Sequence, residues 1–255
     1  MNLSVFIIAK NEEARIATAI NSIKSLASEI IVVDSGSTDN TVLLAQNLGA
    51  TVIFNEWHGY VAQKIFAENL CSNKWVLNLD ADEELSPELI LEIKDLLKTE
   101  PEIKAYNVKA TFIHPQAKKA HTLAPYNKCL RLYHRDYASF NVGEPSLYHD
   151  NVRLIVPTKI KTLKGILYHR SIISISQVIK KWDEYTNIQA QEMLNKGRKP
   201  CFIRLVFEMP LSFLKFFFLR RYFIYGMNGF IYAIIHSSFR FIRLAKAREL
   251  FKKHY

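Results

Sequence analysis

The 255-residue sequence has few cysteines and no long apolar run. Its three cysteines, Cys71, Cys129 and Cys201, stand far apart, so they form no spaced metal motif and suit a reducing cytosol. No stretch reaches the roughly 20 uninterrupted apolar residues that a membrane-spanning helix needs. The N-terminal residues meet Lys10 and Glu12 too soon for a secretory signal peptide. We therefore expect neither a disulfide-rich secreted protein nor one that spans a membrane.

Glycine-rich phosphate-binding loops are also missing. The turn after the first apolar run, residues 9–13, lacks the glycine pattern of a dinucleotide site. No glycine-rich loop ending in Lys-Ser or Lys-Thr marks a P-loop, and Gly36 alone is typical of a turn. A nucleotide bound by this chain must therefore be held by side chains and a metal ion.

Acidic residues are scarce in the last part of the chain. Residues 197–255 hold 12 Lys and Arg against 2 Asp and Glu, whereas residues 1–196 hold 22 of each kind. The tail therefore carries the whole net charge of +10, and it also holds 11 of the 16 Phe. This shift in composition indicates two parts, joined near residues 195–200.

Apolar runs and helical periodicity alternate through the first 80 residues. Buried strands are predicted over residues 3–8, 30–33, 51–54 and 75–79, with helices between them. Asn11 is expected to cap the first of these helices. Strands and helices alternating at these lengths form right-handed βαβ units around a parallel sheet. Further strands over 105–113 and 129–133 would complete a mixed sheet, so we predict the α/β fold class.

Four acids follow the last of these apolar runs, at Asp80, Asp82, Glu83 and Glu84. Open α/β sheets bind ligands at the carboxyl ends of their strands, where these acids should lie. Asp80 and Asp82 stand two residues apart, which in an extended segment places their side chains on the same side. Such a pair favours a hard divalent cation with a substrate phosphate. The alternative is a solvated acidic turn that opens the helix predicted at Ser86.

Three motifs together resemble those of family-2 glycosyltransferases, inverting enzymes of the GT-A fold. They are FIIAKNEE (residues 6–13), IVVDSGSTDNT (31–41) and LNLDADE (77–83). Three more segments look like the bacterial lipopolysaccharide-core β-1,4-glucosyltransferase subgroup: GYVAQK (59–64), LKGILYH (163–169) and YTNIQA (185–190). The resemblance covers nearly the whole chain and weakens after residue 197. It implies transfer of a hexose, expected to be glucose, from UDP-glucose to a glycolipid such as lipopolysaccharide inner-core heptose.

The resemblance also implies roles for residues of the nucleotide-sugar site. Ala9, Asn11 and Glu12 would line the uracil pocket, Asp34 would contact the nucleoside, and Lys64 would approach the nucleotide. For Asp34 the alternative is a capping residue near a helix end, and for Lys64 it is a solvated helix lysine.

Asp80 and Asp82 would form the DxD element of such an enzyme. Asp80 would face the nucleotide sugar, and Asp82 is the stronger candidate ligand of Mn²⁺ or Mg²⁺. A metal there would neutralise charge on the departing nucleoside diphosphate. The resemblance places His169 near this metal. Because His134, His149 and His169 lack zinc-motif spacing, the alternative for each is an ordinary loop residue.

Candidates for the catalytic base lie in residues 142–152. The family carries a His-Asp or His-Glu pair at this point, just before the segment matching 163–169, and His149 with Asp150 fits that order. We predict Asp150 as the base, with His149 orienting it or contacting the acceptor. Glu144, which precedes a proline, is the reserve candidate.

The predicted organisation is a GT-A domain followed by a basic helical segment. The domain would span residues 1–196, as a nucleotide-sugar half (1–99), an acceptor half (100–170) and a packing helix (171–196), with the basic segment at 197–255. The packing helix would begin at Ser174 and turn Val178, Trp182, Tyr185 and Ile188 toward the core.

Three interpretations of the basic segment remain open. Apolar runs broken by arginines suit helices lying on an anionic membrane surface, which would place the protein on the inner face of the cytoplasmic membrane. An ordinary helical subdomain and a nucleic-acid-binding tail are the alternatives, nucleic acid being the least favoured. For the chain as a whole, the alternatives are a sugar nucleotidyltransferase and a non-catalytic binding module.

Overall fold

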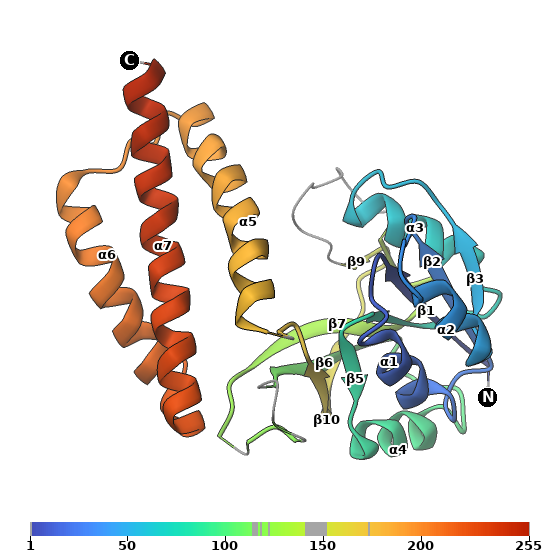
Figure 1. Ribbon diagram of the computed structural model, residues 1–255. Helices are drawn as coiled ribbons and strands as arrows, with labels where there is room; N and C mark the ends of the chain where they lie inside the picture. The colour runs from blue at the N-terminus through green and yellow to red at the C-terminus, as the bar shows by residue number, and fades with distance from the viewer. Residues whose placement is uncertain are drawn as a thin grey trace. The chain divides into compact units, whose positions relative to one another are not determined.

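The computed structural model describes residues 2–113, 117, 119–121, 123–140, 152–172 and 174–254 (Figure 1). The chain divides into two compact units. Met1–Ile113 and Tyr126–Ser171 form the first, called here the sheet unit, and His114–Pro125 and Ile172–Tyr255 form the second, the helical unit.

The sheet unit alternates strands and helices, as its periodicity predicts. Its strands are β1 Leu3–Ala9, β2 Glu29–Asp34, β3 Thr51–Phe54, β4 Trp75–Asp80, β5 Glu83–Leu85, β6 Ala105–Phe112, β7 Tyr126–His134, β8 Ala138–Ser139, β9 Arg153–Leu154 and β10 Ile160–His169. Its helices are α1 Ile16–Ile23, α2 Thr41–Asn47, α3 Tyr60–Leu70 and α4 Pro87–Leu96.

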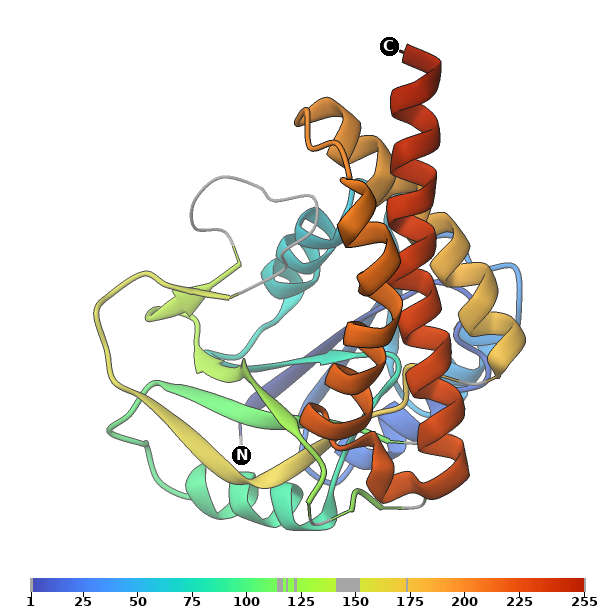
Figure 2. The same cartoon turned by 90° about the vertical axis from the view of Figure 1, so that its left-hand side faces the viewer.

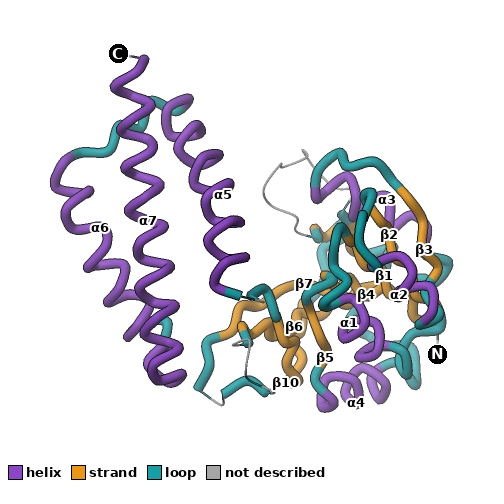
Figure 3. Tube along the Cα trace, viewed as in Figure 1, coloured by secondary structure: helices purple, strands orange, loops and turns teal. Residues whose placement is uncertain are grey.

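Eight of these strands form one sheet in the order β3-β2-β1-β4-β7-β6-β10-β5 (Figure 3). Strands β1 to β4 run parallel, β7 is antiparallel to both β4 and β6, and β10 is parallel to β6. The predicted α/β class, with a parallel core extended by antiparallel strands, is confirmed.

Helices cover both faces of this sheet. Successive residues of a strand point to opposite faces, so β1 sends Leu3, Val5 and Ile7 into one apolar cluster and Phe6 into another. The first cluster includes side chains of α1, α2 and α4, and the second includes side chains of α3 and β8. The central strands of the sheet are therefore buried between helices on both faces.

The register of the parallel strands brings three chain segments to one edge. Ala9, the last residue of β1, pairs with Asp34, the last residue of β2, and Ile8 pairs with Asp80 at the end of β4. The predicted strand-end residues are therefore neighbours in space.

Two local predictions in this unit are incomplete or wrong. Asn11 does not cap α1, which begins at Ile16 after Arg15; instead Asn11 has a positive φ of 55° and accepts from the Thr38 amide at 2.8 Å. Residues 83–85, for which the sequence predicted no strand, form strand β5 against β10. The sequence does not reveal this strand because it contains two glutamates. Glu83 occupies a buried position, where an apolar residue would be expected.

The helical unit contains three long helices. They are α5 Ile175–Asn195, α6 Phe202–Leu214 and α7 Gly226–His254, with a π-helical turn Lys215–Leu219 and a short 3₁₀ turn Tyr222–Tyr225 between the last two. Both α5 and α6 lie alongside α7 (Figure 2). Among the described residues, no helix is long and apolar enough to cross a membrane.

Helix α5 packs on α7 rather than through the face that its sequence predicts. Ser174 caps it, as expected, by accepting from the Gln177 amide at 3.1 Å. Val178 is buried and Trp182 stacks on Phe239 of α7 at 5.4 Å, but Tyr185 and Ile188 are exposed. The buried residues of α5 are Val178, Thr186 and Ala190, whose spacings of eight and four suit a helix that follows one long neighbouring helix.

Candidate active site

The loops after β1 and β2 are joined to each other at the sheet edge. The Asn11 amide donates to Ser37 Oγ at 2.9 Å, while its side-chain oxygen accepts from the Thr38 amide at 2.8 Å. Ala9 is buried in the core, and its carbonyl accepts from the Ser35 amide at 3.0 Å. These bonds fix the relative position of the two segments to which the sequence assigns nucleoside contacts.

Asp34 shapes its own turn. Its Oδ2 accepts from the amides of Gly36 and Ser37 at 2.8 and 2.9 Å, and its Oδ1 accepts from the Ser37 hydroxyl. Gly36 has a φ of 85°, in the region that favours glycine. An ionised carboxylate has about four acceptor positions, so Asp34 keeps capacity for one further donor while holding this loop.

Glu12 is held by an arginine that also approaches the acidic cluster. Arg15 donates Nε and Nη2 to the two carboxylate oxygens of Glu12, each at 2.6 Å. Its Nη1 lies 3.6 Å from Asp82 Oδ2. Arg15 therefore connects the loop after β1 to the turn after β4, a link that the sequence did not predict.

Asp80 lies between two buried cations. Lys64 Nζ, from α3, is 2.8 Å from Asp80 Oδ1, and Arg131 Nη2, from β7, donates to Asp80 Oδ2 at 2.7 Å. Burial raises the pKa of Asp80, but Arg131 and Lys64 outweigh it and hold that pKa well below its usual range. Both oxygens of Asp80 are thus engaged by positive side chains.

Glu83 completes this buried charge network. Its Oε1 accepts from Arg131 Nη2 at 2.6 Å, and its Oε2 accepts from the Asp80 amide at 3.0 Å. Burial raises the pKa of Glu83 to about 7, and the nearby Asp80 adds to the increase while Arg131 opposes it. The network of Lys64, Arg131, Asp80 and Glu83 pairs two cations with two carboxyl groups.

Arg131 is the main residue that the sequence analysis missed. It sits in the apolar stretch Cys129-Leu-Arg-Leu-Tyr133 and is only 9% exposed. A lone cation inside a strand predicted to join this sheet was the available signal. Since buried charges need partners, that arginine pointed to a carboxylate elsewhere in the sheet.

Asp82 has a different environment from Asp80. Its Oδ2 lies 3.2 Å from His169 Nε2, at the end of β10. Burial raises the pKa of Asp82, but His169 and Arg15 together outweigh burial and lower it, so the carboxyl stays ionised. In the same way burial lowers the pKa of His169, and Asp82 outweighs that effect and raises it. The structure therefore brings together two predicted metal ligands that are 87 residues apart in the sequence.

The donor set at Asp82 and His169 fits a metal that also binds a substrate. Within the described residues, no group of three or more His, Cys, Asp or Glu side chains could hold a metal ion. Mg²⁺ is commonly held by one or two carboxylates together with substrate phosphates rather than by an all-protein cage. Asp82 and His169, two ligands at the carboxyl edge of the sheet, leave the remaining positions of such an ion to a substrate.

The three predicted base candidates, Glu144, His149 and Asp150, lie outside the described residues. The segment just before them is anchored by Glu68 of α3, whose carboxylate accepts from the hydroxyls of Tyr133 and Ser139 and from the Phe140 amide. Lys64, one turn earlier on α3, lies 5.6 Å from the centre of the Phe140 ring. Helix α3 thus contacts the Asp80 network and also Ser139 and Phe140, the residues that precede the base candidates.

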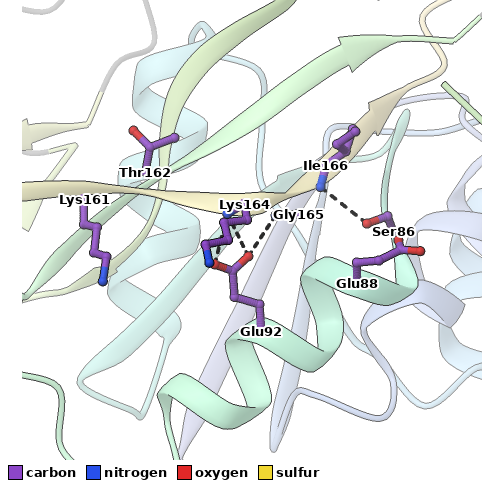
Figure 4. Close-up of a pocket in the computed structure, with 8 residues that line it drawn as sticks. All are labelled: Ser86, Glu88, Glu92, Lys161, Thr162, Lys164, Gly165 and Ile166. Carbon is purple, nitrogen blue, oxygen red and sulfur yellow. Dashed lines mark hydrogen bonds between the residues drawn. The ribbon is translucent and has the colours of Figure 1, made fainter. Parts of the chain in front are cut away.

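A cavity of about 630 Å³ lies elsewhere in the sheet unit, between α4 and β10 (Figure 4). Glu92 Oε2 accepts there from the amides of Lys164 and Gly165, each at 2.8 Å. A Cβ at Gly165 would lie 2.4 Å from Leu89 Cα, so glycine allows α4 to approach the strand. No residue of the acidic cluster lines this cavity, and we do not assign it to the active site.

The α/β sheet and the carboxylates at the carboxyl edge of its parallel strands define a ligand-binding α/β domain. Residues 4–153 match the sequence model of the family described as glycosyl transferase family 2, and the chain belongs to that family. The match confirms the predicted family, GT-A fold class and enzyme class. It decides against the sugar nucleotidyltransferase and the non-catalytic module.

Two relatives are similar over almost the whole chain. An uncharacterized glycosyltransferase of Rickettsia bellii is 47% identical over 254 residues, covering 97% of this chain and 86% of that protein. The lipopolysaccharide core biosynthesis glycosyltransferase LpsC of Rhizobium meliloti is 29% identical over 265 residues, covering 99% and 93%.

A solved structure is similar over a smaller part. Glucosyl-3-phosphoglycerate synthase from Mycobacterium tuberculosis, in complex with Mn²⁺, UDP and glucosyl-3-phosphoglycerate, is 29% identical. The match covers 45% of each chain with a TM-score of 0.36, too partial to transfer that enzyme's ligands to this one.

Proposed function

We propose that the protein transfers glucose from UDP-glucose to a glycolipid acceptor of the lipopolysaccharide inner core, with inversion. The family match supports sugar transfer, and the similarity to LpsC over nearly the full chain supports the acceptor class. The observation that carries the proposal is the pairing of Asp82 with His169 at the carboxyl edge of the parallel strands.

Asp82 and His169 would hold Mn²⁺ or Mg²⁺ together with the donor's diphosphate. When bound, the metal supplies Lewis-acid neutralisation of the charge on the leaving nucleoside diphosphate. The imidazole ligand favours Mn²⁺, because Mg²⁺ takes oxygen ligands at near-ideal octahedral geometry. Arg15, 3.6 Å from Asp82 Oδ2, adds a second positive group beside these ligands.

Asp80 and Lys64 would position the groups around the donor rather than bind the metal. Lys64 is almost fully buried and paired with Asp80, so its proposed role is to hold that carboxylate beside the donor. Asp80 is the last residue of β4 and precedes Asp82 by two residues, so its ion pairs with Lys64 and Arg131 would fix where the Asp82 turn begins. Asn11, Asp34 and Glu12 would shape the nucleoside pocket through the joined loops after β1 and β2.

Inversion requires a single displacement at the anomeric carbon. Asp150 would remove the proton of the acceptor hydroxyl, whose oxygen then attacks that carbon as the nucleoside diphosphate leaves. His149 would orient Asp150 or contact the acceptor, and Glu144 remains the reserve base.

A glycolipid acceptor implies work at a membrane surface. We propose that the protein binds peripherally to the inner face of the cytoplasmic membrane through residues 197–255. The excess of 12 Lys and Arg over 2 Asp and Glu in that segment supports attraction to anionic headgroups.

The donor and metal are tested by the hydrolysis of labelled UDP-sugars in the absence of acceptor. We expect release of UDP from UDP-glucose with Mn²⁺, a smaller rate with Mg²⁺, and none with EDTA. Asp82→Asn should abolish this release without altering the circular dichroism spectrum, whereas Asp95→Asn, an exposed acid on α4, should leave it unchanged. Equal rates in EDTA and Mn²⁺, or an active Asp82→Asn enzyme, would refute the metal assignment.

The acceptor is tested by adding truncated lipopolysaccharides and measuring transfer of label from UDP-glucose. Transfer to a heptose-terminated inner core, and none to lipid A alone, is expected. Transfer from UDP-galactose or UDP-N-acetylglucosamine at a higher rate would reassign the donor while leaving the reaction class in place.

A further inference from the structure

Helix α6 buries two polar residues and exposes most of its large apolar side chains. The buried residues of α6 are Glu208 and Ser212. Its exposed large apolar side chains are Phe202, Ile203, Val206, Phe207, Met209, Leu211 and Leu214. A helix of a water-soluble domain normally places its apolar stripe toward the core and its polar residues toward water, so α6 is reversed.

Ion pairs with α7 hold α6 in this orientation. Glu208 accepts from Arg240 Nε at 2.7 Å, and Arg243 Nη2 lies 3.8 Å from the same carboxylate oxygen. Arg204, on α6 itself, reaches the other oxygen at 3.5 Å. Because a buried carboxylate is costly without such partners, turning α6 over would break this cluster.

The apolar surface continues beyond the end of α6. In the π-helical turn, Phe218 and Leu219 are exposed, Leu219 to 78% of its surface. Phe223 and Met227 extend the same kind of surface into the start of α7. We call the exposed apolar residues of 202–227 the α6 face; large contiguous apolar patches of this kind mark interaction sites.

The charges around the α6 face select its partner. Exposed cations precede it at Arg198 and Lys199 and lie among its residues at Lys215, Arg220 and Arg221. The one acid in residues 196–227 is Glu208, which is buried and already paired. A second copy of the chain would therefore bring positive charge against positive charge, whereas an anionic lipid surface complements the cations.

The groove beside α6 has matching chemistry. A cavity of about 490 Å³ between α6 and α7 is lined by apolar side chains, among them Phe202, Val206 and Phe241. Arg248, Lys252 and Glu249 also line it. Apolar walls with two cations nearby suit an acyl chain joined to a phosphate.

We propose that the α6 face is inserted into the headgroup and acyl boundary of an anionic bilayer, as a helix lying in the membrane plane. Such helices bury one apolar face shallowly and keep cations at the headgroups. The proposal rests on the membrane-surface location given above and assigns it to particular residues. It needs no spanning segment, and none is present among the described helices.

Vesicle flotation of the full chain tests this assignment. Vesicles of phosphatidylcholine with phosphatidylglycerol should carry the protein upward, and vesicles of phosphatidylcholine alone should carry much less. Phe207→Glu with Leu211→Glu should weaken partitioning by at least about 100-fold, the order expected when two inserted side chains are lost. Leu91→Glu, an equally exposed apolar position on α4, is the matched control and should float as the wild type does.

The same samples test the membrane proposal separately from the proposed enzymatic function. Each variant is also assayed for Mn²⁺-dependent release of UDP from UDP-glucose, which should be unchanged because the α6 face holds no proposed active-site residue. Flotation of the double variant at the wild-type level overturns the proposal. A second outcome also overturns it. In that outcome the wild-type chain does not bind vesicles but forms a dimer in light scattering, and the double substitution dissociates the dimer. A wild-type chain that floats as expected but releases no UDP from UDP-glucose would instead count against the proposed function.

Discussion

Glu83 gives the protein a defined dependence of stability on pH. Its pKa in the folded chain is raised to about 7 from the ordinary value of 4.5, mainly by burial. Between these two values the folded chain holds a proton on Glu83 that the unfolded chain has released. The Glu83 contribution to the free energy of unfolding is therefore full below pH about 4.5 and is lost as the pH rises through about 7.

The size of this effect follows from the shift. One pKa unit corresponds to about 1.4 kcal/mol, so the full contribution is on the order of 3 kcal/mol. Glu83 is almost fully buried, so solvent screening does not reduce it much. Glu83→Gln removes the titration while keeping one acceptor oxygen for Arg131. The variant should lose the Glu83 slope of about 1.4 kcal/mol per pH unit between pH 5 and 7.

Urea denaturation of both proteins in EDTA, at half-unit steps from pH 5 to 8, measures the difference. The raised pKa of His169 gives a slope of the same sign, so the comparison uses wild type minus variant rather than the raw curve. Glu84→Gln, at the neighbouring acid paired with Arg170, is the control and should keep the wild-type slope. Parallel curves for wild type and Glu83→Gln would refute the reasoning, because Glu83 would then be ionised throughout.

Three further predictions concern the buried network, the base and the close approach of α4. Arg131→Met should lower the free energy of unfolding at pH 8 by about 3–5 kcal/mol, because it leaves buried carboxylates uncompensated. Urea denaturation measures this change. In the same assay the control Lys128→Met, at an exposed position on β7, should change the free energy of unfolding by less than about 0.5 kcal/mol. Asp150→Asn should reduce kcat for transfer by about 10²–10⁴-fold with little change in UDP-glucose affinity, and a full loss in Glu144→Gln with an active Asp150→Asn would reverse the assignment. Gly165→Ala should lower thermal stability by about 1–3 kcal/mol through overpacking against α4, and an unchanged Tm would show that α4 can shift.

Local sequence patterns were sufficient to predict most of the strands and helices of the sheet unit. The strands over 3–8 and 75–79 are apolar runs ended by polar residues, and Ser86 with Pro87 forms the capping arrangement observed at the start of α4. These features act within a few residues, so they can be recognised without knowing the fold. Strand β10 was not recognised from the same kind of pattern, because Lys161, Lys164 and Gly165 interrupt its apolar positions.

The sequence also predicted the sheet edge on which the candidate site lies. It did not predict which acidic side chain pairs with which basic side chain there. Asp80 and Asp82 follow a buried strand, which places them at the carboxyl edge of a parallel sheet. Their spacing suggested that they act on one ion together. In the structure Asp80 is paired with Lys64 and Arg131, and Asp82 with His169.

The sequence by itself determined the βαβ order, the acids at the strand ends and the basic, aromatic composition of the tail, because each depends on neighbours along the chain. Tertiary structure alone decided which carboxylate meets which cation, since Arg131 and His169 are 51 and 87 residues from their partners. It also decided which side of α6 faces outward. Helical periodicity separates an apolar side from a polar one, but the ion pairs of Glu208 with Arg240 and Arg243 turn the polar side inward.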